Sequence, residues 1–392
     1  MKRALKSLDI LKGIAIIMII IVHNRHFIMQ DMTGFRQLIN FGQMGVAIFF
    51  MVSGMALCYS WTHQCESCSQ KGVHNYLRFV KRRYLRLAPG FLMILLINLL
   101  LNILFLDILE YSPGYIMNRE PLGLLVNMLF LHGLFPEYIN SVFPGGWYIG
   151  STFLLYLLFP ILFFLFDKIY QKRKNNVLIL PFLLWFVNYL LLKKLAISSD
   201  YTIYPSNCSF LYYFFLNQLP CFSMGILLFF QEKDARSRKC PLPISLLFSI
   251  LFTFLSVYLY LQPDEHRFLF TIIPFLVSIA SYWFAIFLLH IEECHSFPSA
   301  FQIIIDFVAD CGKHSYEMYL MHGFFSWYGI KAFTLALAER GIAYNDLLLY
   351  LILLPITILL VYLSSHPLSV LLNKIDSKLR YRVFSIIKKR AL

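Results

Sequence analysis

The chain contains ten apolar runs of about 20 residues, the length that a helix needs to cross the hydrocarbon core of a bilayer. Such runs replace alternating or amphipathic patterns throughout the 392-residue sequence. They lie at residues 8–29, 40–61, 87–107, 147–167, 177–197, 210–231, 243–262, 267–290, 315–337 and 346–371. The sequence therefore predicts an all-α, polytopic integral membrane protein with about ten transmembrane helices.

The composition supports this fold class, because 59% of the residues are hydrophobic and only 14% are charged, whereas about 25% are charged in soluble domains. The net charge is +13, and the distribution of the basic residues along the chain is explained by membrane topology. With the N-terminus inside, 26 of the 34 lysine and arginine residues fall in inward segments, as the positive-inside rule requires. We therefore expect cytoplasmic termini, a multi-pass location in the plasma or inner membrane, and no nucleic-acid partner.

Two units are predicted, a transmembrane domain at residues 1–371 and a basic cytoplasmic tail at residues 372–392. The tail is expected to contact anionic lipid of the bilayer. Between the third and fourth spans, the apolar stretch 122–135 is too short to cross a membrane and predicts a re-entrant or interfacial helix. An eleventh span is the alternative, although it disrupts the charge pattern that follows.

The first apolar run carries two ionisable side chains on one face. Lys12 and His23 are eleven positions apart, which returns to nearly the same side of a helix about 16 Å along its axis. Because such groups are costly in lipid, we expect both to face the bundle. His23 is either hydrogen-bonded between helices or a general base. Lys12 either reaches the membrane surface or, held by Asp9, meets an anionic ligand.

The inward segment before the third span has four basic residues in six positions, 81–86. Such a segment usually marks topology and lipid contact, but arginines also match the geometry of phosphate. Arg83 and Arg86 are thus candidates for binding a phosphorylated ligand. In the second span, Ser53 and Gly54 indicate either close helix packing or the lining of a narrow channel.

Polar and aromatic residues also open two later spans. Trp147 starts the fourth span and belongs either to an aromatic belt or to a substrate site. Glu317 and His322 are polar groups in the ninth span and are candidates for function. Because the ninth span enters from the cytoplasmic side, His322 is predicted not to share a catalytic centre with His23.

Cys65 and Cys68 form a CxxC pair near His63 and His74, which is only half of a zinc-binding motif. We therefore predict no metal ion and no permanently bound cofactor. A structural disulfide is not expected in this cytoplasmic loop either.

Five short motifs, in this order, resemble the membrane-bound acyltransferase-3 family over residues 7–371. They are KGxA at Lys12 followed by His23, FFxxSG at Phe49, RxxRLxP at Arg83, the tryptophan at Trp147, and SYxxYLxH at Ser315. The resemblance implies a membrane acyltransferase that moves an acyl group, often acetyl, from acyl-CoA. The acceptor implied is a hydroxyl of a cell-surface carbohydrate or a similar molecule.

By this resemblance His23 matches the catalytic histidine, Lys12 the basic residue of the first span, and Arg83 and Arg86 the arginines associated with the acyl donor. Two positions depart from the family pattern. Lys12 stands where arginine is more common, so the charge is kept but the bidentate fork is lost. Thr152 stands where relatives often have an acidic residue, so no charge-relay role is assigned to it.

The same residues are compatible with another class of protein. In a transporter or flippase for a lipid-linked sugar or small anion, Lys12 and His23 would line the translocation path. That function predicts substrate movement without acyl-CoA. A non-catalytic membrane scaffold is a third reading, and it predicts no phenotype when His23 is altered.

Overall fold

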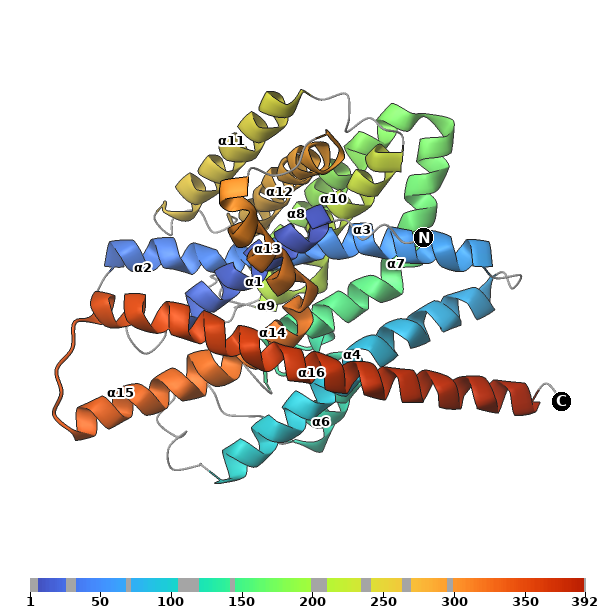
Figure 1. Cartoon of the computed structure of the whole chain (residues 1–392). Coiled ribbons are helices and arrows are strands. Elements are labelled where there is room, and N and C mark those ends of the chain that lie inside the picture. The colour runs from blue at the N-terminus through green and yellow to red at the C-terminus, as the bar shows by residue number, and fades with distance from the viewer. Residues whose placement is uncertain are drawn as a thin grey trace.

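The computed structural model describes residues 6–25, 33–67, 72–104, 120–141, 145–198, 210–233, 241–262, 269–294 and 299–390. Helices joined by short turns make up the described residues, and no strand occurs among them (Figure 1). The predicted all-α fold class is confirmed.

The elements are described here in chain order. Those before residue 173 are α1 (Lys6–Asn24), α2 (Thr33–Asn40), the 3-10 turn η1 (Phe41–Met44), α3 (Gly45–Ser67), α4 (Val73–Leu104), α6 (Pro121–Met128), the 3-10 turn η2 (His132–Leu134) and α7 (Gly146–Lys172). Those after it are the 3-10 turn η3 (Lys174–Leu178), α8 (Ile179–Ser198), α9 (Phe210–Tyr213), α10 (Phe215–Lys233), α11 (Leu242–Tyr260), α12 (Leu269–Cys294), α13 (Ser299–Lys313), α14 (Ser315–Gly323), the π-helical turn η6 (Phe324–Gly329), α15 (Ile330–Glu339) and α16 (Asp346–Arg390).

Nine helical segments among the described residues are long and apolar enough to cross a membrane. They contain α1, α3, α4, α7, α8, α10, α11, α12 and α16. The tenth predicted span, residues 315–337, corresponds to α14, η6 and α15, which follow one another with a π-helical turn in the middle. The stretch 122–135 forms the eight-residue α6 and the turn η2, so the alternative of an eleventh span is wrong.

Helix α13 was not predicted, because its 15 residues are too few and too polar to form a span. It packs against α1 through two glycines. A Cβ atom at Gly13 would lie 1.9 Å from the Val308 carbonyl oxygen, and one at Gly312 would lie 1.7 Å from the Asp9 carbonyl oxygen. The two helices therefore meet backbone to backbone, as small residues allow in membrane bundles.

The N-terminus of α1 is anchored by acidic side chains of neighbouring helices. Glu292 of α12 accepts hydrogen bonds from the backbone N–H groups of Lys6 and Ser7, each at 3.1 Å. These N–H groups have no partner within the helix, so a carboxylate there satisfies them. The Lys6 ammonium also forms a 2.5 Å ion pair with Asp306 of α13. These contacts fix the rotation of α1 and thus the direction of its functional face.

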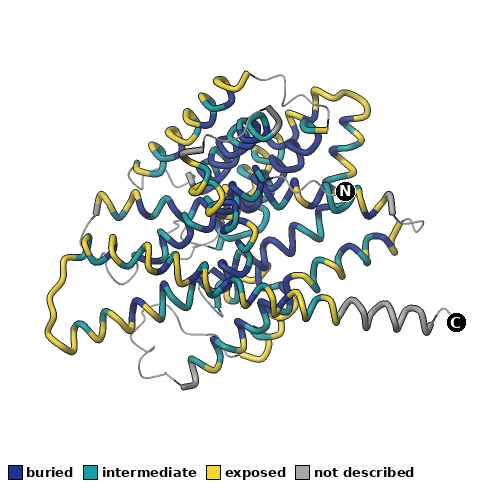
Figure 2. The backbone as a smooth tube through the Cα atoms, in the orientation of Figure 1, coloured by how far each residue is buried: buried dark blue, intermediate teal, exposed yellow. Residues whose placement is uncertain are grey.

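Burial divides the bundle into a centre and a periphery (Figure 2). The spanning windows that contain α3 and α10 are 78% buried, whereas those of α11 and α16 are 17% buried and present apolar side chains suited to lipid. The central pair also packs through glycines, since a Cβ at Gly54 would lie 2.2 Å from the Phe222 carbonyl oxygen and one at Gly225 1.7 Å from that of Met51. The predicted packing role of Gly54 is confirmed.

The predicted boundary between the transmembrane domain and the tail stays a prediction, because α16 continues without a break from Asp346 to Arg390. In Figure 1, α1 runs from the middle of the bundle to the left and α16 runs from left to right, so the beginning of α1 points toward the side where α16 ends. This arrangement is compatible with two termini in one compartment.

Candidate active site

A cavity of about 360 Å³ lies between α1, α3, α4, α7, α13 and α14. Its lining includes four residues that the sequence analysis proposed for ligand binding, namely Lys12, Ser53, Arg83 and Arg86. They come from three different helices, α1, α3 and α4. Tertiary packing therefore brings these candidates to a single site.

The charge of this lining is strongly positive. The charged residues in it are the cations Lys12, Arg83, Arg86 and Lys313 and the carboxylate Asp9. Asp9 is already engaged, because one of its oxygens lies 2.6 Å from the Lys12 ammonium. The remaining positive charge suits an anionic ligand such as a phosphate group.

Helix α4 presents two of its four arginines, Arg83 and Arg86, to the cavity because residues three apart share a helical face. Arg83 donates a hydrogen bond to the Ser60 hydroxyl of α3, and its guanidinium carbon lies 5.3 Å from the centre of the Phe79 ring. Arg86 is one turn further along and more exposed. Arg83 is thus held by neighbouring side chains, while Arg86 has room to reach a ligand.

Aromatic residues form another part of the cavity wall. The ring centres of Tyr148 and Tyr319 are 4.9 Å apart, and Phe49 lies 5.7 Å from Tyr148. The Tyr319 hydroxyl donates a 2.6 Å hydrogen bond to the carbonyl oxygen of Gly145, just before α7. This part of the cavity is uncharged and suits an acyl chain better than a phosphate.

Two histidines meet beside this aromatic wall. The ring centres of His23 and His322 are 5.1 Å apart, and the ring of Trp327 in the π-helical turn lies 6.5 Å from His23. His322 is fully buried and His23 is half-buried. The predicted orientation of His23 toward the bundle is therefore observed.

The prediction that His322 does not share a centre with His23 is wrong. Helix α14 begins at Ser315, which lines the same cavity as Lys12. His322 is seven residues after Ser315, which places it about 10 Å further along α14. His23 lies about 16 Å along α1 from Lys12, so both histidines lie on the far side of the cavity from Lys12 and Ser315. The entry side of a helix does not determine the depth of a residue two turns later, and here the two imidazoles meet.

The hydrogen bonding of His322 defines which of its ring nitrogens is basic. Nδ1 contacts the carbonyl oxygen of Tyr319, which only accepts hydrogen bonds, so Nδ1 carries the hydrogen. Nε2 then has a free lone pair, and it is buried without a hydrogen-bond partner among the described residues. A neutral imidazole with an available nitrogen is the form that accepts a proton.

The histidine pair lies next to the cavity and outside its lining. Tyr319 connects the two regions, because it lines the cavity and its ring centre is 5.0 Å from that of His322. A ligand that extends from the cationic part of the cavity toward the imidazoles must therefore pass Tyr319.

Trp147 lies in the first turn of α7. It is buried inside the bundle, so the aromatic-belt interpretation is wrong. Its ring stacks on Tyr213 at 4.5 Å, and it is not part of the cavity lining, where its neighbour Tyr148 is found instead. Thr152 does line the cavity and brings no charge to it.

Sequence reasoning did not single out Lys313 or Tyr319 as site residues. Lys313 was counted only as an inward charge, although it lies two positions before the SYxxYLxH motif. Tyr319 is part of that motif, but tyrosines are numerous in this chain and carry little signal alone. Their positions in the cavity wall are findings of the structure.

Comparison with known families supplies independent evidence on identity. The family model Acyl_transf_3, described as an acyltransferase domain, matches residues 5–366 and so covers nearly the whole chain. The chain belongs to the acyltransferase-3 family. Comparisons with curated proteins and with solved structures give no match.

Membership of the acyltransferase-3 family makes this protein a multi-pass membrane transferase of acyl groups. Such an enzyme needs an acyl donor, an acceptor and a lipid bilayer. The family match covers all the helices whose side chains line the cavity, from α1 to α14. The cavity and the adjoining histidines are therefore the candidate active site.

Proposed function

We propose that the protein transfers an acyl group, most simply acetyl, from cytosolic acyl-CoA to a hydroxyl of a cell-surface carbohydrate or a similar acceptor. The observation that carries this proposal is that Lys12, Arg83 and Arg86 line one cavity. The histidine pair adjoins this cavity, because Tyr319 of the cavity wall contacts His322. The protein is then expected in the plasma or inner membrane, where it meets both substrates.

In this proposal the donor binds through its phosphates at the cationic part of the cavity. Arg83 and Arg86 offer planar donor groups that match phosphate oxygens, and Lys12 adds a charge on the neighbouring helix. The thioester then extends past Tyr148 and Tyr319 toward the imidazoles. The aromatic wall suits the uncharged arm and acyl group of the donor.

His23 is proposed as the general base. It removes the proton of the acceptor hydroxyl as the oxygen attacks the thioester carbonyl. A carbon–oxygen bond forms, the carbon–sulfur bond breaks, and the proton passes to the leaving CoA thiolate. His322 stands 5.1 Å away between ring centres and is proposed to orient or assist His23.

The test uses the full-length protein purified in detergent and supplied with labelled acetyl-CoA and a hydroxyl acceptor. CoA release is expected from the natural sequence and should fall by about 100-fold or more in His23→Ala, since general base catalysis contributes at least that factor. The matched control is His74→Ala, which removes an exposed histidine outside the cavity lining and should leave release unchanged.

Two results would contradict the proposal. Full activity in His23→Ala would exclude His23 as the base. Movement of a lipid-linked sugar or anion across vesicles without acyl-CoA, together with no CoA release, would instead favour a transporter or flippase.

A further inference from the structure

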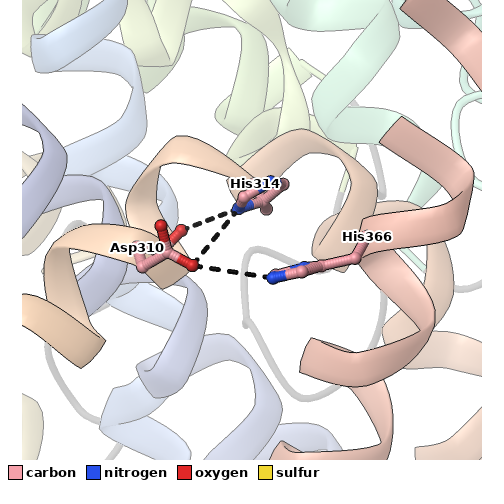
Figure 3. Close-up of side chains that lie close together, drawn as sticks. All are labelled: Asp310, His314 and His366. Carbon is pink, nitrogen blue, oxygen red and sulfur yellow. Dashed lines mark hydrogen bonds and ion pairs between the residues drawn. The ribbon is translucent and has the colours of Figure 1, made fainter. Parts of the chain in front are cut away.

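A second cluster of polar side chains lies where α13 and α14 meet α16, outside the cavity lining (Figure 3). Asp310 belongs to α13, His314 joins α13 to α14, and His366 belongs to α16. One potential ligand atom from each residue lies within 4.8 Å of the other two. This cluster was not predicted from the sequence, in which the CxxC pair was the pattern considered for metal binding.

The distances in this cluster resemble those between ligands of one ion. One carboxylate oxygen of Asp310, Oδ2, lies 3.7 Å from His314 Nδ1 and 3.7 Å from His366 Nε2. These separations exceed the usual range of a hydrogen bond, about 2.7–3.2 Å. Ligands that bind zinc tetrahedrally at about 2.0–2.1 Å lie about 3.4 Å apart. The two carboxylate-to-imidazole distances are close to that spacing, and the two histidine nitrogens, which lie within 4.8 Å of each other, would have to approach the same ion.

Neighbouring groups hold the three side chains in place. The His314 and His366 rings stack with centres 4.2 Å apart, and the Tyr362 ring packs edge-on at 4.6 Å from that of His366. The Tyr362 hydroxyl donates a 2.8 Å hydrogen bond to Asp310 Oδ2. Hydrogen bonds of this kind orient the ligands of metal sites.

The cluster is open enough for an ion to enter, because the three side chains are between 23% and 41% exposed. Lys313 lies 3.5 Å from Oδ1 of Asp310, the other carboxylate oxygen. Oδ2 is the oxygen that faces both imidazoles.

We propose that Asp310, His314 and His366 bind a divalent first-row transition metal ion of the Zn²⁺ type, with water completing its coordination. Two imidazoles and one carboxylate form a donor set suited to such ions, whereas Mg²⁺ and Ca²⁺ prefer oxygen ligands alone. His314 Nδ1 also lies 3.1 Å from the Asp310 carbonyl oxygen, so to bind the metal it would give up this hydrogen bond and the imidazole would carry its hydrogen on Nε2 instead.

The bound ion would clamp α16 onto the junction of α13 and α14. That junction borders the candidate active site, because Lys313 and Ser315, on either side of His314, line the cavity. The role inferred for the metal is therefore structural support of the cavity wall, and it does not depend on the proposed acyl-transfer chemistry.

The test measures metal binding by the full-length protein in detergent after removal of metals with a chelator. Equilibrium dialysis against Zn²⁺ or Co²⁺, followed by elemental analysis, should give one ion per chain for the natural sequence. His366→Ala and Asp310→Asn should each weaken this binding by about 10-fold or more, because a three-ligand site loses one ligand. Zn²⁺ should also raise the unfolding temperature of the natural protein and have a smaller effect on either variant.

Two further variants are controls. One distinguishes loss of a ligand from misfolding, and the other tests whether the metal binds near the CxxC pair instead. His366→Cys keeps a donor atom at this position and should bind Co²⁺ with a new thiolate-to-cobalt absorption band. His63→Ala removes a histidine near the CxxC pair and should leave metal binding unchanged. Of that pair, Cys65 lies within the described residues and Cys68 lies outside them. The proposal is overturned if the natural protein binds no ion, if His366→Ala and Asp310→Asn bind normally, or if only His63→Ala abolishes binding.

Discussion

At the scale of single residues, the site combines two kinds of chemistry that are separated by one aromatic side chain. The cationic groups, among them Lys12 and Arg86, line the cavity. The two imidazoles lie outside the lining, next to Tyr319. The charged and the basic groups thus act on different parts of an extended ligand. Substitutions in the two regions are expected to alter different kinetic constants.

Replacing Arg86 tests the cationic part. Arg86→Ala should raise the KM for acyl-CoA by about 10-fold and leave kcat nearly unchanged, because a hydrogen bond to a charged group contributes about 1.5–3 kcal/mol. Steady-state CoA release over a range of acyl-CoA concentrations measures both constants. Lys81→Ala is the matched control, since this exposed cation lies on the same helix outside the cavity lining. An unchanged KM for Arg86→Ala would exclude a role in donor binding.

Replacing His322 tests the imidazole part. His322→Gln keeps a hydrogen-bonding side chain of similar size but removes the basic nitrogen, so we expect kcat to fall by about 10-fold or more with little change in KM. The same kinetic assay measures this split. A fall in apparent acyl-CoA affinity at constant kcat would show instead that His322 contacts the donor.

At the scale of helices, glycine contacts decide how closely the elements that carry the site approach one another. Gly13 and Gly312 let α1 and α13 touch through their backbones, which places Lys12 near Lys313 in one lining. The π-helical turn η6 widens the helix after His322, and its Trp327 reaches His23. Local backbone geometry therefore sets the distances within the site.

Replacing Gly312 tests this packing. In Gly312→Ala the new Cβ would lie 1.7 Å from the Asp9 carbonyl oxygen, so the helices must separate. The better helix propensity of alanine gives about 1 kcal/mol, but overpacking costs about 1–3 kcal/mol. We expect a lower unfolding temperature in detergent. Gly34→Ala in α2, whose new Cβ would meet no atom within 4 Å, is the control and should unfold at the original temperature or slightly above it, since it gains helix propensity without overpacking.

At the scale of the whole molecule, the helices form a bundle with a buried centre and a lipid-facing rim (Figure 2). The site lies between helices of the centre and helices that reach the rim. If the basic segments face the cytoplasm, as the sequence predicts, the cationic cavity opens toward that side and the imidazoles lie deeper in the bundle, so the two substrates would approach from opposite faces of the membrane.

This arrangement requires a particular orientation in the membrane. Alkaline phosphatase fused after Leu392 should be inactive, because the C-terminus is expected in the cytoplasm, where the fusion does not fold. Inserted at residues 107–119, in the predicted outward connection between the third and fourth spans, it should be active. Activity assays on intact cells measure both. The opposite pattern would place the cationic cavity away from cytosolic acyl-CoA.

The spacing of apolar and basic residues alone determined the fold class, nearly all of the spans and the shared face of Lys12 and His23. These properties follow from bilayer thickness and helix geometry, which act locally along the chain. The family motifs also placed Lys12, Arg83 and Arg86 in one functional group before their common cavity was seen.

Tertiary structure alone decided the contact of His23 with His322, the burial of Trp147, the packing of α13 and the cluster around Asp310. Each depends on how far one helix is shifted or rotated against another. That geometry is set by glycine contacts and side-chain packing between segments that are distant in the sequence, which no local pattern in the sequence encodes.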